Sequence, residues 1–192
     1  RRTIFERTAP KSVDVLVLFG PNNVSYFSRF GFVATERPIA YILTADKSIL
    51  LLPRLEVEHG EEVGLVDEVI GYPEYPGEEP PLHALRDKMI DLGLANATLG
   101  VDGDGYGRLY GYRGPKVSEL LPGATVVDVL DEIEHMQMVN SPEELALLRE
   151  ACKWGDLAHR YLQDYCEVGV SEIEIAQKAS MAASRDMLLT LG

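Results

Sequence analysis

The stretch that decides the fold is DVLVLFGPNNVSYF, residues 14–27. It contains a continuous apolar run over 15–19, which is typical of a strand buried on both faces of a sheet. Gly20 and Pro21 end the run, and the residues that follow predict a short helix or turn over 21–27. The stretch therefore predicts a central strand that leads directly into a helical segment.

Further strands and helices alternate along the chain after this stretch. Two apolar segments, 39–44 and 49–52, flank a polar turn and predict a β-hairpin. The other expected elements are an acidic helix over 54–63, a strand over 68–70, a loop over 73–81, a helix over 82–92, a strand over 98–101, a broken helical region over 106–121 and a strand starting at Val126. Because a hairpin interrupts the alternation, we expect an α/β fold with a mixed, about six-stranded sheet flanked by helices.

Residues 139–192 predict a helical hairpin. The motif Ser-Pro-Glu-Glu at 141–144 supplies an N-cap, a first-turn proline and a capping box for a helix with one apolar face. A second capping box at 171–174 starts another helix. We expect an α/β domain over residues 1–138, followed over 139–192 by a linker and the first two helices of a further domain whose remainder lies outside the sequence.

The charge of the chain restricts its partners. The formal net charge is −13, and −8 of it lies between residues 54 and 91, where eleven acidic residues stand against three basic ones. Such a field repels phosphate backbones and anionic lipid headgroups, so we expect neither nucleic acid nor a membrane surface as a partner. No apolar run approaches the roughly 20 residues of a membrane-spanning helix, and the N-terminus lacks the apolar block of a signal peptide.

The two cysteines indicate the cellular compartment. Cys152 and Cys166 fall within one expected helix, where a rise of about 1.5 Å per residue places them roughly 21 Å apart, too far for a disulfide. Both lie on the apolar face of that helix. We therefore expect buried free thiols in a reducing environment and a cytoplasmic protein.

Motifs for catalysis or metal binding are incomplete in the sequence taken alone. The histidines form no paired ligand motif, and His59, near two glutamates, is either a metal ligand or part of an exposed acidic helix. The stretch 102–105 resembles the start of a calcium loop, but Tyr106 and Arg113 stand where that loop needs oxygen ligands. The glycines of 103–111 lack the spacing of a dinucleotide-binding loop and favour a flexible turn. The residues by themselves predict a non-catalytic domain.

Five segments in consistent order resemble the creatinase/prolidase/aminopeptidase P family. They are 14–30, 51–56, 99–102, 139–151 and 168–176. The first resembles a strand followed by the family's N-x-x-Y-x-S/T-G-F turn, and the fourth resembles its K-S-x-x-E-I-x-x-L-R-x-A linker. Asn140 stands where the family usually has Lys, and Arg29 where it often has Gly.

The resemblance implies a small N-terminal α/β domain joined to a catalytic domain of the pita-bread fold. In this family the catalytic domain binds two divalent metal ions (Mn, Co or Zn) through two Asp, one His and two Glu, and hydrolyses the peptide bond ahead of proline. These five ligands follow the helical hairpin. We therefore expect no catalytic residue, metal ligand or bound cofactor within this chain.

The resemblance also implies a homodimer in which the N-terminal domain lends a residue to the neighbour's active site. The corresponding segment runs here from Gly31 to Pro38. Within it, Arg37 is the candidate to bind a substrate carboxylate through its planar guanidinium; the alternative is a surface arginine in a loop. Tyr26 is a second candidate substrate-binding residue, with packing as its alternative role.

These expectations converge on the N-terminal, non-catalytic part of a metal-dependent Xaa-Pro dipeptidase or aminopeptidase that shapes substrate access and dimerisation. Two alternatives stay open. The same fold occurs in creatinase- and lyase-type enzymes that act on non-peptide substrates, and the chain could instead be a binding module without hydrolase activity. Metal ligands further along the protein separate the binding module from the enzymes, and hydrolysis of proline peptides separates the two kinds of enzyme.

Overall fold

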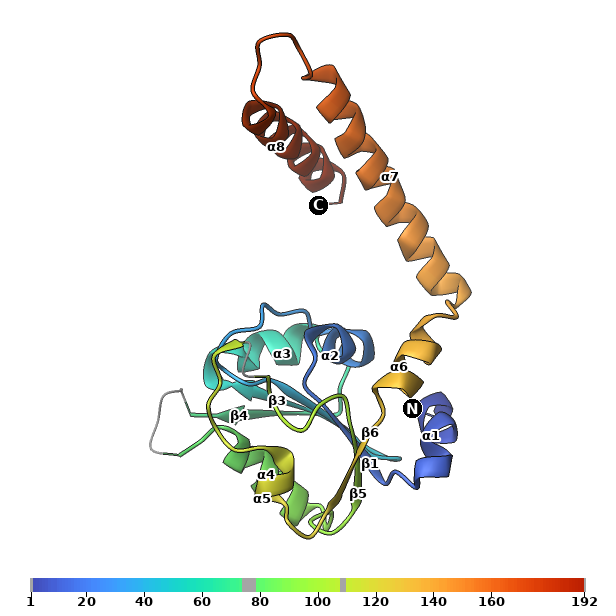
Figure 1. The fold of residues 1–192 in the computed structure, drawn as a ribbon, viewed down its shortest axis with the longest axis vertical. Helices are drawn as coiled ribbons and strands as arrows, with labels where there is room; N and C mark the ends of the chain where they lie inside the picture. The colour runs from blue at the N-terminus through green and yellow to red at the C-terminus, as the bar shows by residue number, and fades with distance from the viewer. Residues whose placement is uncertain (1, 74–78, 108–109, 192) are drawn as a thin grey trace. The chain divides into compact units, whose positions relative to one another are not determined.

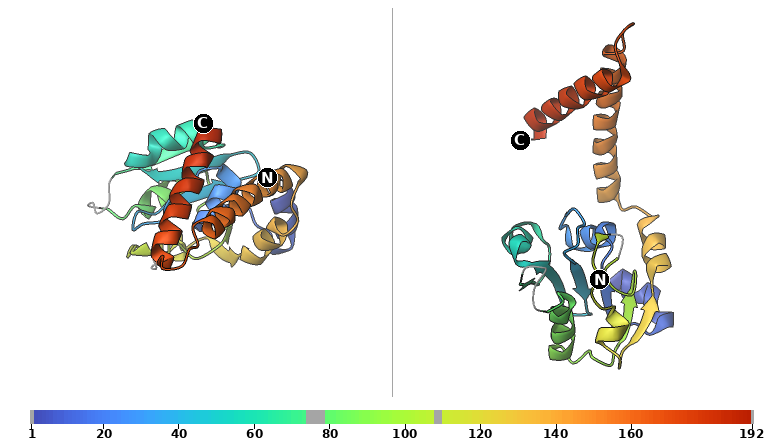
Figure 2. Two further views of the ribbon diagram at one scale, coloured as in Figure 1. Left: turned by 90° about the horizontal axis from the view of Figure 1, so that it is seen from above. Right: turned by 60° about the vertical axis from the view of Figure 1, so that its left-hand side comes forward.

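The computed structural model describes residues 2–73, 79–107 and 110–191. The chain divides into two compact units, Arg1–Gln137 and Met138–Gly192. Figures 1 and 2 show that the first unit contains the sheet and that the second is a pair of helices. Within the described ranges, every helix is too short or too polar to span a bilayer.

The sheet of the first unit is mixed and has the strand order β4-β3-β2-β1-β5-β6. Its strands are β1 (Val15–Leu18), β2 (Ala40–Leu43), β3 (Ser48–Pro53), β4 (Glu68–Tyr72), β5 (Thr98–Val101) and β6 (Thr125–Asp128). β2 pairs antiparallel with both β1 and β3, whereas the pairs β1–β5, β3–β4 and β5–β6 are parallel. The six-stranded mixed sheet and the hairpin of β2 and β3 confirm the fold expected from the sequence.

Helices cover both faces of this sheet (Figure 1). One face packs against α1 (Arg2–Thr8), α2 (Pro21–Ser28), α3 (Val57–Val63) and α6 (Leu130–Gln137), and the other against α4 (Leu82–Asp91) and α5 (Val117–Leu120). Two short 3-10 turns, Ala9–Lys11 and Arg54–Glu56, follow α1 and precede α3. Because successive strand side chains alternate, Val15 and Val17 join the core under α4, while Leu16 and Leu18 join the core under α2. All four are fully buried, as the apolar run predicts.

The elements differ from the sequence-based prediction in four places. The broken helical region expected over 106–121 is wrong, since among its described residues only Tyr110, in a 3-10 turn, and Val117–Leu120, in α5, are helical. Gly111 within it has φ +92°, a left-handed conformation that a right-handed helix does not accommodate. The spacing of apolar residues does not predict α1 or α6, because neither is long enough to show a clear helical period. β4 extends past the predicted 68–70 to Tyr72.

The second unit consists of α7 (Pro142–Asp164) and α8 (Glu172–Leu191). Ser141 Oγ accepts a hydrogen bond from the Glu144 N–H at 3.2 Å, and a Glu144 carboxylate oxygen accepts one from the Ser141 N–H at 2.6 Å. These two bonds confirm the predicted capping box. The Tyr161 hydroxyl donates a hydrogen bond to Asp186 and so joins the two helices. The predicted helical hairpin is therefore present.

The thiols of this unit are exposed, contrary to the prediction. Cys152 lies on α7, Cys166 lies beyond the end of that helix, and both are free and exposed. α7 contains no buried residue, and Ala179 is the buried residue of α8. Within this unit the two helices bury little of each other's surface, so the apolar face that was expected to bury the thiols stays exposed.

Candidate functional site

The candidate site lies at the edge of the sheet where β1 and β5 end. These strands are parallel neighbours, so Gly20 and Asp102, which follow them, lie at the same edge. The chain leaves β1 toward α2 on one face and leaves β5 toward α5 on the opposite face. In open α/β sheets such a reversal of direction between neighbouring parallel strands is the usual place for a ligand site.

The carboxylate of Asp102 fills the centre of this edge. Its two oxygens accept hydrogen bonds from the backbone N–H groups of Phe19 at 2.8 Å and Gly20 at 2.9 Å, and from Asn23 Nδ2 at 2.9 Å. Asn23 Oδ1 in turn accepts a hydrogen bond from Gln137 Nε2 at 3.2 Å. A helix N-terminus at a strand end favours negative charge. Here that charge comes from the protein's own Asp102, which ties β5 to the start of α2.

Three tyrosines line the loop that follows β5. The rings of Tyr106 and Tyr110 have centroids 5.4 Å apart, and the ring of Tyr112 meets that of Tyr106 edge-on at 6.1 Å. Tyr106 is 5% exposed, and burial raises the pKa of its hydroxyl to about 12. This hydroxyl lies beside the backbone of Thr35 without a hydrogen bond of good geometry. At neutral pH it is therefore a neutral phenol within the core.

The structure places Arg37 and Tyr26, the two residues singled out from the sequence, in different parts of this region. Arg37 is half-buried just before β2, and its backbone N–H donates a hydrogen bond to Thr35 Oγ1 at 3.3 Å. Tyr26 lies on α2, is 40% exposed and meets the ring of Phe27 edge-on at 5.3 Å. The half-exposed Tyr26 is not a core residue. The role of each in substrate binding stays a prediction.

His59 and the acidic residues near it form no metal centre in the described chain. The His59 ring lies 3.4 Å from a Glu56 carboxylate oxygen through Nδ1 and packs on Phe30 with a centroid distance of 5.1 Å. Within residues 2–73, 79–107 and 110–191, no three His, Cys, Asp or Glu side chains are grouped closely enough to hold a metal ion. The residues present thus do not fit the two-metal set that the family resemblance implies.

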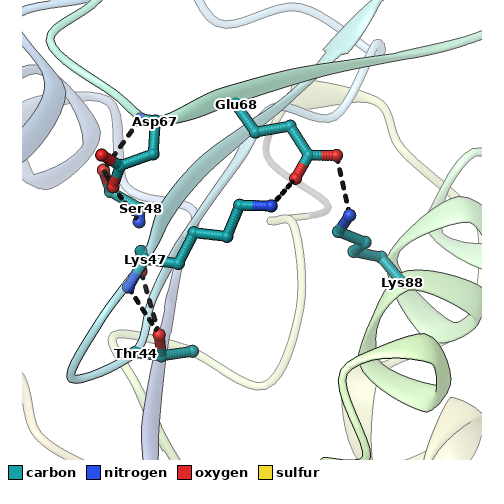
Figure 3. A network of polar contacts seen from close by, with 6 residues as sticks. All are labelled: Thr44, Lys47, Ser48, Asp67, Glu68 and Lys88. Atoms are coloured by element: carbon teal, nitrogen blue, oxygen red, sulfur yellow. Dashed lines mark hydrogen bonds and ion pairs between the residues drawn. The ribbon is translucent and has the colours of Figure 1, made fainter.

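A polar network lies at the opposite edge of the sheet, where β3 and β4 begin (Figure 3). Glu68 pairs with Lys47 of the hairpin turn and, at 2.7 Å, with Lys88 of α4. Asp67 accepts hydrogen bonds from the backbone and the hydroxyl of Ser48, both at 2.7 Å. Hydrogen bonds from Lys47 and then Lys88 lower the pKa of Glu68. Because each member has a partner within the fold, we interpret this network as structural.

Sequence reasoning missed Asp102 and Tyr106 as organising residues of the site. Asp102 directly follows a buried strand, which is a recognisable signal for a residue at the functional edge of a sheet. The contact of Tyr106 with Thr35 joins segments 71 positions apart in sequence (106 − 35). No local pattern predicts such a contact.

Comparison with known proteins identifies the first unit. Residues 2–139 match the family model described as "Creatinase/Prolidase N-terminal domain". The chain is also 24% identical over 185 residues to the creatinase of Bacillus sp. (strain B-0618), an alignment that covers 96% of this chain and 44% of that protein.

Two solved structures have a similar fold. The prolidase from Pyrococcus horikoshii OT3 matches with a TM-score of 0.72 and 20% identity, over 96% of this chain and 48% of that one. The Xaa-Pro dipeptidase from Bacillus anthracis matches with a TM-score of 0.73 and 16% identity, with the same two coverages. The chain thus spans less than half the length of these three proteins.

Proposed function

The chain belongs to the Creatinase/Prolidase N-terminal domain family, and from this we propose that it is the non-catalytic N-terminal part of a metal-dependent Xaa-Pro dipeptidase or aminopeptidase. The observation that carries the proposal is the match of residues 2–139 to that family. The similarity in fold to a prolidase and an Xaa-Pro dipeptidase supports the peptidase assignment. We assign the metal ions and the hydrolytic step to the part of the whole protein outside this chain.

The proposed role of the first unit is to shape substrate access in a homodimer. The segment from Gly31 to Pro38 supports this role because Gly31, Val33 and Thr35 are exposed and because it leads into β2, whose Tyr41 pairs with Leu18 at the end of β1. Val33 within it is 86% exposed even though the apolar residues Phe30 and Ile39 on either side are buried. An exposed apolar side chain suits contact with a second protein surface. Arg37 then binds the carboxylate of a substrate held in the partner's active site.

Replacement of Arg37 in the full-length protein tests this role. We expect Arg37→Ala to raise KM for an Xaa-Pro peptide by roughly tenfold with little change in kcat, because the lost contact binds ground state and transition state alike. Arg37→Lys keeps the charge but loses the planar guanidinium, so its KM should lie between those of the wild type and Arg37→Ala. Arg7→Ala, which removes an exposed arginine of α1, is the control. An unchanged KM in Arg37→Ala would exclude Arg37 from substrate binding.

A second function has an observation in its favour. The creatinase of Bacillus sp. (strain B-0618) aligns with 96% of this chain, so the whole protein could act on a guanidino compound such as creatine instead of a peptide. The fold is compatible with both activities, because a fold of this kind does not determine the substrate. Direct comparison of the two substrates distinguishes them.

A further inference from the structure

The segment that carries Arg37 crosses from one face of the sheet to the other. At its start, Phe30 is buried in the core under α2, and the ring of Phe32 stacks on it with a centroid distance of 5.9 Å. Two residues later, Ala34 packs against the core on the opposite face, the one that contains Tyr106 and Tyr112. A segment with apolar anchors on both faces must pass around the sheet edge where β1 ends.

Two consecutive residues of this segment, Thr35 and Glu36, meet the loop after β5, and the residue before them packs on the same core. Ala34 packs on the tyrosine-containing core, and the Thr35 backbone lies beside the Tyr106 hydroxyl. Glu36 faces Gly111 so closely that a Cβ atom at position 111 would lie 3.4 Å from the Glu36 Cβ. Arg37 follows immediately, with its N–H bonded to Thr35 Oγ1. The backbone that presents Arg37 therefore rests on this loop.

We define Tyr106, Gly111 and Tyr112 as the tyrosine platform. Its two rings are 5% and 2% exposed, so they are fixed by packing and not by solvent-facing contacts. Gly111 has φ +92°, which lets the backbone turn beside Glu36 at a point where other residues are strained. Asp102 anchors the start of this loop through its bonds to Phe19 and Gly20.

We propose that the tyrosine platform positions Arg37 for substrate binding, so that Tyr106 and Gly111 are positioning residues for the reaction. This inference rests on the proposed function. It also gives the glycines of 103–111, which match neither a calcium nor a dinucleotide loop, a different purpose: they shape a loop that holds a neighbouring segment. Positioning matters because a bidentate guanidinium contact depends on the direction of the donor pair.

A matched pair of glycine variants in the full-length protein tests the proposal. Gly111→Leu inserts a side chain against Glu36. Gly93→Leu imposes the same kind of backbone strain, at φ +73°, but a Cβ added at Gly93 has no atom of a non-adjacent residue within 4 Å. We expect amide hydrogen exchange over residues 33–37 to accelerate roughly fivefold in Gly111→Leu and to stay unchanged in Gly93→Leu. We also expect KM for an Xaa-Pro peptide to rise in Gly111→Leu alone, and this rise to vanish when Arg37 is already alanine.

The outcomes separate this inference from the proposed function. Equal amide exchange rates over 33–37 in the two glycine variants would contradict the proposal that the tyrosine platform positions Arg37. A rise in KM that persists when Arg37 is already alanine would contradict it as well. If Gly111→Leu fails to fold, Tyr106→Leu takes its place, since it removes the ring contact but introduces no strained residue. It should likewise accelerate amide exchange over 33–37 and raise KM. If the wild-type protein hydrolyses no Xaa-Pro peptide, the proposed function fails, while the exchange comparison still decides whether the platform holds the segment.

Discussion

Single residues at the carboxyl edge of the sheet show how local chemistry organises this fold. Asp102 has the sequence context of a calcium ligand, yet its carboxylate accepts hydrogen bonds from two backbone N–H groups and the Asn23 amide. Charge-assisted bonds of this kind are among the stronger hydrogen bonds in proteins. The residue therefore serves as an internal anion that joins β5 to the start of α2.

Removal of this carboxylate should destabilise the first unit. We predict that Asp102→Ala lowers the free energy of unfolding by about 2–4 kcal/mol, because it leaves partly buried donors without an acceptor. Asp104→Ala is the control: Asp104 accepts hydrogen bonds from the backbone and hydroxyl of the exposed Ser118, so its loss should cost about 0.5–1 kcal/mol. Urea unfolding of a fragment spanning residues 1–137 measures both. Equal losses in the two variants would contradict the account of Asp102.

The loop position of Arg37 was predictable from the sequence, but the contacts made by the residues just before it were not. The segment 31–38 lies between a predicted helix and a predicted hairpin, and this placement alone predicts a connecting loop. The contact of Thr35 and Glu36 with Tyr106 and Gly111 depends on how the segment passes around the sheet edge. That path is set by long-range packing of Phe30 and Ala34 on opposite faces, which periodicity does not encode.

At the scale of elements, those with a strong local signal agree with the structure. The apolar run before Gly20 became β1, and the capping box at Ser141 starts α7. The prediction of a broken helix over 106–121 was wrong because it treats the glycines and Pro115 as interruptions of a helix, whereas Gly111 adopts a left-handed conformation. β4 and α4 are joined by Glu68 and Lys88, a contact between side chains that appears only after the elements have packed.

The Glu68 network should make stability depend on pH. The pKa of Glu68 is lowered from its ordinary value of 4.5, first by the hydrogen bond from Lys47 and then by that from Lys88. A lowered pKa in the folded state adds stability above pH 4.5, and this is lost as the pH falls through the folded-state value. We predict that Glu68→Gln is less stable than wild type at pH 6 by about 1 kcal/mol or less, and that the difference shrinks below pH 4.5.

Thermal unfolding of both forms between pH 3 and pH 7 measures this difference. Glu61→Gln, which alters an exposed carboxylate of α3 outside the network, controls for the general effect of acid. A difference between wild type and Glu68→Gln that is constant across the range would mean that Glu68 does not carry the pH dependence.

At the scale of the whole molecule, the two units differ in how much they bury. The first unit has apolar cores on both faces of its sheet, whereas the second leaves large apolar side chains such as Leu147 and Leu189 exposed. The family match ends at residue 139, and the chain spans less than half of the proteins it resembles. The described chain establishes the fold and the family, whereas the substrate and the metal ions are proposed for the whole protein.

The most direct test of the central claim is a substrate comparison with the full-length protein expressed from its native reading frame. In the presence of Mn²⁺, release of proline from an Xaa-Pro dipeptide is measured beside hydrolysis of creatine, before and after treatment with a chelator. The account predicts hydrolysis of the dipeptide with kcat/KM at least roughly a hundredfold above that for creatine, and loss of activity after metal removal. Preference for creatine, or hydrolysis of neither substrate, would contradict it.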